Sequence, residues 1–139
     1  MIVLDTNVFS EALKPAPSSV VALWFRAQDA TGVYITAITE AEVLYGVESL
    51  PHGRRRSQLL DAVEKILKTE YERRILPFDE PAARLYATIT AGREAAGRPI
   101  SAMDAMIAAI ARLHGAAVAT RNTKDFEGCG IHTINPWSV

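Results

Sequence analysis

Short apolar runs alternate with longer amphipathic segments along the chain. The runs are rich in β-branched and aliphatic side chains, a composition typical of buried strands. Gly, Pro, Ser or charged residues flank most of them and separate them from the neighbouring segments. We expect strands at Ile2–Leu4, Val33–Thr36, Ile75–Phe78, Ala116–Thr120 and Ile131–Ile134.

The segments between these runs carry apolar residues at helical spacing. Helix signals bound several of them, such as Pro15 after the first segment, Asp79-Glu80-Pro81 before a later one, and Gly115 after the last. The expected helices cover residues 7–13, 18–25, 39–47, 59–67, 79–97 and 101–113. Strands that alternate with helices predict an α/β fold with a mostly parallel central sheet flanked by helices.

A length of 139 residues predicts one domain over residues 1–139, and a composition of 49% hydrophobic and 22% charged residues suits a folded core. Cys129 is the single cysteine, which excludes an intramolecular disulfide and fits a reducing compartment. The first apolar run reaches a carboxylate at Asp5, so it is too short for a signal-peptide core. We therefore expect a cytoplasmic protein without membrane association.

Three carboxylates come from places that a parallel sheet brings together. Asp5 follows the first strand, while Glu42 and Asp104 lie near the starts of helices, and ligands bind beyond the carboxyl ends of parallel strands. At 4 Å each pair of carboxylates repels by about 4 kcal/mol when the effective dielectric constant is near 20. A bound cation relieves that repulsion, and oxygen ligands favour Mg²⁺, with Mn²⁺ as a substitute.

A structural interpretation fits the same carboxylates. Thr39-x-x-Glu42 and Ser101-x-x-Asp104 both match the capping pattern, in which an acidic residue satisfies the first amides of a helix. Asp5 alone fits a residue that forms a turn. Spacing and periodicity leave the metal-ligand and capping interpretations open.

The charge balance gives no general affinity for nucleic acid. With 15 basic and 16 acidic residues the formal net charge is −1, whereas nucleic-acid-binding domains usually carry a basic excess. Binding to a polyanion therefore requires a local basic patch. Arg121 and Lys124, beside the expected acidic site, are our candidates for contacting the phosphates of such a polyanion.

Four motifs follow one another along almost the whole chain. They are Leu4-Asp5-Thr6-Asn7-Val8-Phe9-Ser10, Thr39-x-Ala41-Glu42-x-x-x-Gly46, Asp104-Ala105-x-Ile107-Ala108-Ala109 and Thr120-Arg121-Asn122-Thr123-Lys124-Asp125-Phe126. In this order they resemble the PIN-domain nucleases, and more narrowly the VapC and FitB type toxins of bacterial toxin–antitoxin pairs. The ending 134–137 is also similar to that of FitB-like members.

The resemblance implies a magnesium-dependent ribonuclease that a small antitoxin holds inactive. It also implies a homodimer that binds operator DNA through the antitoxin complex. Asp5 and Asp104 would be the principal metal ligands, Glu42 would help to hold the metal or its water, and Thr6 would orient Asp5. FitB-like members have Asp where this chain has Asn122, so we expect one metal ion, with Asp125 as a candidate for the missing charge.

Two other functions remain open. A small phosphatase would use Asp5 as the residue that accepts the phosphoryl group, although Thr6 and Asn7 come directly after it and the second acid of such a site is missing. A nuclease scaffold with weak catalysis would serve only to bind an antitoxin and co-repress transcription, an alternative that Asn122 favours.

Overall fold

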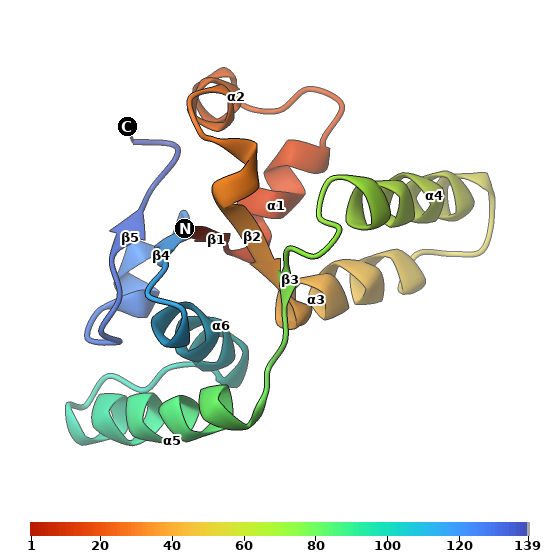
Figure 1. Ribbon diagram of the computed structural model, residues 1–139. Helices are drawn as coiled ribbons and strands as arrows, with labels where there is room; N and C mark the ends of the chain where they lie inside the picture. Colours follow the sequence, from red (N-terminus) through yellow and green to blue (C-terminus); the bar gives the residue numbers. More distant parts are fainter. Residues whose placement is uncertain (139) are drawn as a thin grey trace.

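The central sheet of the computed structural model has five parallel strands in the order β3-β2-β1-β4-β5, within the described residues 1–138. Figure 1 shows the strands crossing the middle of the molecule. The expected α/β architecture is confirmed, and every strand pairing is parallel. The strands are β1 (Ile2–Leu4), β2 (Val33–Thr36), β3 (Ile75–Leu76), β4 (Ala117–Ala119) and β5 (Thr133–Ile134).

The helices coincide with the predicted helical segments, although several of their ends are shifted. The third helix begins before Thr39, and the fourth begins well before Leu59, directly after Gly53, whose φ of 152° favours glycine. The helices are α1 (Thr6–Leu13), α2 (Ser19–Arg26), α3 (Ala37–Glu48), α4 (Arg54–Thr69), α5 (Glu80–Ala95) and α6 (Ala102–Leu113), with the 3-10 turns η1 (Ala30–Gly32) and η2 (Thr123–Phe126).

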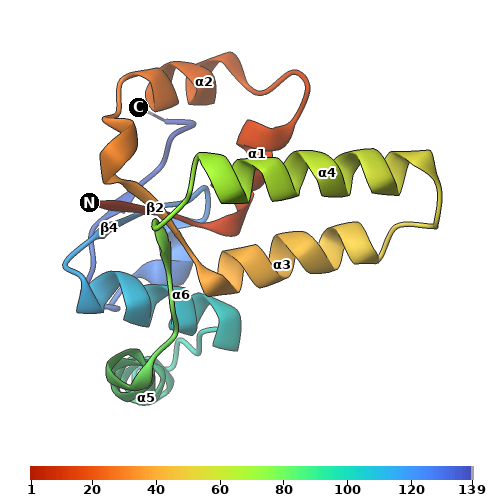
Figure 2. The same cartoon turned by 45° about the vertical axis from the view of Figure 1, so that its right-hand side comes forward.

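Helices cover both faces of the sheet (Figures 1 and 2). Helices α1 to α4 pack on one face around residues such as Leu4, Phe9 and Ile35, while α5 and α6 pack on the other around Val3 and Ile107. Adjacent strand residues therefore point to opposite cores, which is why the strands are apolar throughout rather than alternating. In residues 1–138 no helix is both long and apolar enough to span a membrane.

The expected third strand is longer than the observed one. Strand β3 ends at Leu76 because Pro77 has no N–H to continue the ladder of hydrogen bonds. Strand β4 also lacks the predicted Ala116 and Thr120. The side chain of Thr120 instead contacts Asp5 at the end of β1.

Thr36 joins β2 to α3 and caps the helix. Its buried hydroxyl accepts a hydrogen bond from the Thr39 amide at 3.2 Å. We expect Thr36→Ala to lower the free energy of unfolding by about 1 kcal/mol, measured by chemical denaturation. Thr88→Ala, on the exposed surface of α5, is the matched control and should change stability little. Equal stability of Thr36→Ala and the wild type would contradict this role for the cap.

Candidate active site at the carboxyl edge of the sheet

Asp5 lies at the centre of the site, where β1 ends and α1 begins. Its amide donates to the Ala119 carbonyl on β4 at 2.8 Å, which fixes the backbone beside the neighbouring strand. Its buried carboxylate accepts hydrogen bonds from the Thr6 amide at 2.8 Å, the Thr120 hydroxyl at 2.7 Å and the Asn7 side-chain amide at 3.4 Å. A carboxylate has about four acceptor positions, so Asp5 both caps α1 and retains capacity for another ligand.

Glu42 is held by the Thr6 hydroxyl rather than by helix amides. The Thr6 hydroxyl donates to Glu42 Oε1 at 2.8 Å and lies 3.0 Å from the Thr39 hydroxyl. The capping interpretation of Glu42 is wrong, because α3 starts at Ala37 with Thr36 as its cap. Glu42 therefore lies in the second turn, beyond the free amides of the first.

Asp104 lies in the first turn of α6, where the Ser101 hydroxyl accepts from its amide at 3.2 Å. The expected cap at Ser101 is thus present. Partial burial raises the pKa of the Asp104 carboxyl, and the negative charge of Asp5 raises it further. The Asp104 carboxylate therefore interacts electrostatically with Asp5, in addition to its position in the capped first turn of α6.

Burial and the negative charges of nearby carboxylates also raise the pKa of Asp5. Burial is the largest cause, hydrogen bonds from Thr120 and Thr6 lower the pKa, and the charges of Glu42 and Asp125 raise it. Asp125 also raises the pKa of Asp104. The negative charges of Glu42, Asp104 and Asp125 thus form one repelling cluster with Asp5 at its centre. The sequence predicted that Glu42 and Asp104 would lie near Asp5.

The carboxylates are too widely spaced to enclose a metal ion completely. In the part of the chain that the structure describes, no three His, Cys, Asp or Glu side chains are grouped tightly enough to hold a metal ion by themselves. Mg²⁺ usually keeps several waters and takes only one or two carboxylates from the protein. Hard oxygen donors gathered around Asp5 fit such an ion, because its charge offsets their repulsion.

The other predicted residues surround this cluster. The resemblance implied that Thr6 orients Asp5. In the structure the Thr6 backbone amide donates to Asp5, while the Thr6 hydroxyl donates to Glu42. Asn122 is exposed, and its backbone amide donates to the Thr120 hydroxyl at 3.0 Å. Arg121 and Lys124 are exposed, and the Arg121 guanidinium lies 4.8 Å from the centre of the Trp137 ring.

Sequence reasoning missed two polar side chains of the site. Thr120 donates to Asp5, and Asn7 links Asp5 to the amide of Arg121, which donates to Asn7 Oδ1 at 3.3 Å. Thr120 comes directly after β4 as Asp5 does after the adjacent β1, and this shared position was a usable signal. Asn7 stood in the first of the four motifs, but nothing in the sequence assigned it a role of its own.

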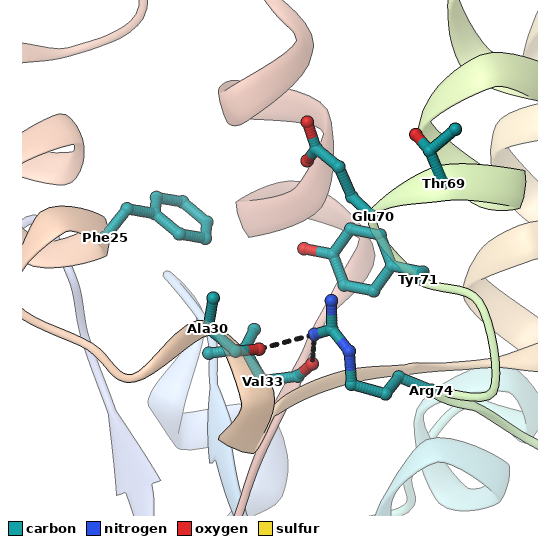
Figure 3. Close-up of a pocket in the computed structure, with 7 residues that line it drawn as sticks. All are labelled: Phe25, Ala30, Val33, Thr69, Glu70, Tyr71 and Arg74. Atoms are coloured by element: carbon teal, nitrogen blue, oxygen red, sulfur yellow. Dashed lines mark hydrogen bonds between the residues drawn. The ribbon is translucent and has the colours of Figure 1, made fainter.

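Two hollows differ in their relation to the site. One of about 350 Å³ adjoins Thr6 and Glu42, and its walls are mainly apolar residues of α1, α3 and α4. The other, of about 390 Å³, lies by the amino ends of β2 and β3. There Arg74 donates to the carbonyls of Ala30 and Val33 beneath the Tyr71 ring (Figure 3). Only the first of these two hollows adjoins the carboxylates.

A parallel α/β domain with an acidic site at the carboxyl edge of its sheet is the class that the geometry defines. The chain belongs to the PIN-domain family, whose pattern it matches over residues 2–128. Within that family it is of the VapC and FitB type.

Similarity to individual proteins extends over the whole chain. It is 43% identical to VapC ribonuclease Y4jK of Sinorhizobium fredii over 99% of this chain and 98% of that protein. It is 42% identical to toxin FitB of Neisseria gonorrhoeae over 99% of each. The crystal structure of FitAcB from Neisseria gonorrhoeae superposes with a TM-score of 0.94 at 41% identity and covers all of both chains.

Proposed function

We propose that this protein is a metal-dependent endoribonuclease and the toxin of a toxin–antitoxin pair. The observation that carries the proposal is the set of mutually repelling carboxylates around buried Asp5, at the edge of the sheet where such folds bind ligands. Two relatives that match over nearly the whole chain, one named a VapC ribonuclease and the other a tRNA(fMet)-specific endonuclease, support RNA as the substrate.

Asp5 and Asp104 are the residues we assign to hold one Mg²⁺, or Mn²⁺ in its place. Bound Mg²⁺ would polarise a phosphoryl oxygen and lower the pKa of a water. Glu42, held by the Thr6 hydroxyl, would accept the proton of the attacking water. Hydrolysis in line would leave a 5′-phosphate and a 3′-hydroxyl.

Neighbouring polar groups have supporting tasks. Thr120 and Asn7 fix the Asp5 carboxylate by hydrogen bonds, which reduces the reorganisation needed when a ligand binds. Asp125 supplies negative charge that the chain lacks at Asn122. Arg121 and Lys124, exposed beside the carboxylates, would contact the RNA phosphates.

The proposed partners are an antitoxin, a second copy of the chain, and operator DNA through the antitoxin complex. Solved relatives support the antitoxin and DNA assignments, because one is described as FitAB bound to a DNA fragment and another as DNA-bound VapBC. The DNA assignment also fits a net charge of −1, since the chain itself has no basic excess. We place its activity in the cytoplasm, where RNA is present and a free Cys129 stays reduced.

Cleavage of RNA by the purified protein tests the proposed function. We expect cleavage with Mg²⁺ or Mn²⁺, loss of cleavage with EDTA, and inhibition by the product of an adjacent antitoxin gene. End labelling of the products identifies the 5′-phosphate. An absence of cleavage and of Mn²⁺ binding, with antitoxin binding intact, would favour the co-repressor scaffold that Asn122 suggested.

The phosphatase alternative has less support in the site. Asn7, two residues after Asp5, donates an amide hydrogen to Asp5 Oδ2 and provides no second acid. Asp5 already accepts three hydrogen bonds, which stabilise its charge and reduce its nucleophilicity. Trapping of a phosphoaspartate at Asp5 would reverse this preference.

A further inference from the structure

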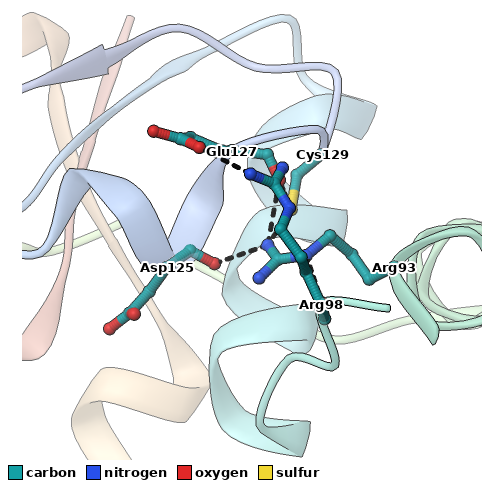
Figure 4. Close-up of polar contacts among 5 residues, drawn as sticks. All are labelled: Arg93, Arg98, Asp125, Glu127 and Cys129. Atoms are coloured by element: carbon teal, nitrogen blue, oxygen red, sulfur yellow. Dashed lines mark hydrogen bonds and ion pairs between the residues drawn. The ribbon is translucent and has the colours of Figure 1, made fainter. Parts of the chain in front are cut away.

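Arg93 on α5 is a buried cation that lies outside the four sequence motifs of the family. Only 7% of its surface is exposed. Its Nη1 donates to the carbonyls of Asp125 at 2.8 Å and Glu127 at 2.9 Å, and it lies 3.6 Å from Cys129 Sγ. Its Nε donates to the Arg98 carbonyl at 2.6 Å. One guanidinium therefore joins the end of α5 to the segment 125–129 (Figure 4).

The segment that Arg93 holds carries the fourth carboxylate of the site. The Asp125 backbone faces Arg93, while its carboxylate points away from the guanidinium (Figure 4). Hydrogen bonds connect this segment to Asp5. The Asp125 amide donates to the Asn122 carbonyl at 3.0 Å, and the Asn122 backbone amide donates at 3.0 Å to the Thr120 hydroxyl, which contacts Asp5. The Asp125 charge accordingly raises the pKa of Asp5 and of Asp104. The position of the Asp125 backbone thus determines how far its charge lies from the proposed metal ligands.

Because Arg93 is buried, its hydrogen bonds to residues 125–129 are expected to contribute more to stability than exposed contacts do. Carbonyls that lose their donor inside a protein are left unsatisfied, and a planar guanidinium can donate in several fixed directions at once. A second contact between the same elements, the Arg98–Glu127 ion pair at 2.8 Å, has both side chains about half exposed. Such exposed pairs contribute little, so the buried contact is the one expected to fix the segment.

We propose that Arg93 is a positioning residue that sets Asp125 beside Asp5 and Asp104, and so tunes the affinity of the site for a divalent cation. This inference rests on the proposed function, since it concerns the same site. Arg93 acts through the backbone of residues 125–129 and touches neither substrate nor metal.

The test measures Mn²⁺ affinity by calorimetry for the wild type, Arg93→Met, Asp125→Asn and the double variant. We expect Arg93→Met to weaken binding about 10-fold, as loss of a group that supports a ligand does. In the Asp125→Asn background the same substitution should cause little further loss, because the carboxylate it positions is gone. A residue with only a structural role would lower the melting temperature without this non-additivity.

Arg98→Ala is the matched control, because it removes the exposed contact to the same segment. It should change Mn²⁺ affinity by no more than about two-fold. Arg93→Lys keeps the positive charge and the aliphatic part of the side chain. It replaces Arg93→Met in the test if that variant fails to fold. Its single ammonium cannot span the contacts of the fork, so it should also bind Mn²⁺ more weakly than the wild type.

Wild-type affinity in Arg93→Met, or in Arg93→Lys where only that variant folds, would overturn the positioning role. Losses that simply add to those of Asp125→Asn would also overturn it, because Arg93 would then act by another route. A wild-type protein that binds no Mn²⁺ would refute the proposed function and the inference with it. The wild-type titration therefore distinguishes the two failures.

Discussion

Asp104→Asn is expected to lower RNA cleavage at least about 100-fold and to leave the fold intact. The substitution keeps the shape of the side chain and the Asp104 amide that donates to Ser101. It removes the charge that we assign to the metal. Because burial and the charge of Asp5 raise the pKa of Asp104, the ionised carboxylate destabilises the metal-free protein at neutral pH. The melting temperature of the variant should therefore equal or exceed that of the metal-free wild type.

Initial cleavage rates, melting temperatures and Mn²⁺ titrations on the same samples check this prediction. Asp61→Asn is the matched control, since Asp61 is exposed on α4, and it should cleave RNA at the wild-type rate. Full activity in a folded Asp104→Asn protein would remove Asp104 from the site. Loss of activity together with a large drop in melting temperature would return Asp104 to the role of a helix cap.

Periodicity and the apolar runs predicted the fold well because the helices and strands bury continuous apolar faces. The limits of β2 were predicted correctly, and those of β3 were not, since Pro77 ends its ladder. The start of α3 was also wrong. Thr36 and Thr39 are both buried threonines that suit a cap. Thr36 is the one used because it ends β2 with an extended backbone, directly before the first helical residue Ala37.

The candidate site was predictable as far as single residues carry a signal. The sequence placed Asp5, Glu42 and Asp104 near the predicted ends of strands and helices. In the structure Glu42 lies one turn further into its helix, and the charges of Glu42 and Asp104 still interact with that of Asp5. Thr120 and Arg93 act across long stretches of sequence, on Asp5 and on the segment 125–129. Such contacts depend on how the strands and helices pack, so local periodicity alone could not identify these pairs.

A divalent cation is expected to stabilise the protein strongly at pH 7.5. A ligand at 100 times its Kd contributes about 2.7 kcal/mol to the free energy of unfolding, which raises the melting temperature of a domain of this size by roughly 5–10 °C. Thermal melts with Mn²⁺ and with EDTA measure the shift, and Asp104→Asn should show much less of it. An equal shift in both proteins would place the cation elsewhere on the molecule.

The pH dependence of that shift results from the raised pKa values of Asp5 and Asp104. Between the ordinary Asp value of about 3.9 and the raised values, the folded metal-free protein binds more protons than the unfolded chain. Its stability from these groups is therefore greatest at low pH and falls as the pH rises through the folded pKa values. Cations require the ionised carboxylates, so the Mn²⁺-induced shift should grow over the same pH range. In metal-free melts, the wild type should lose stability relative to Asp104→Asn as the pH rises, whereas a constant difference would show that the Asp104 pKa is not raised.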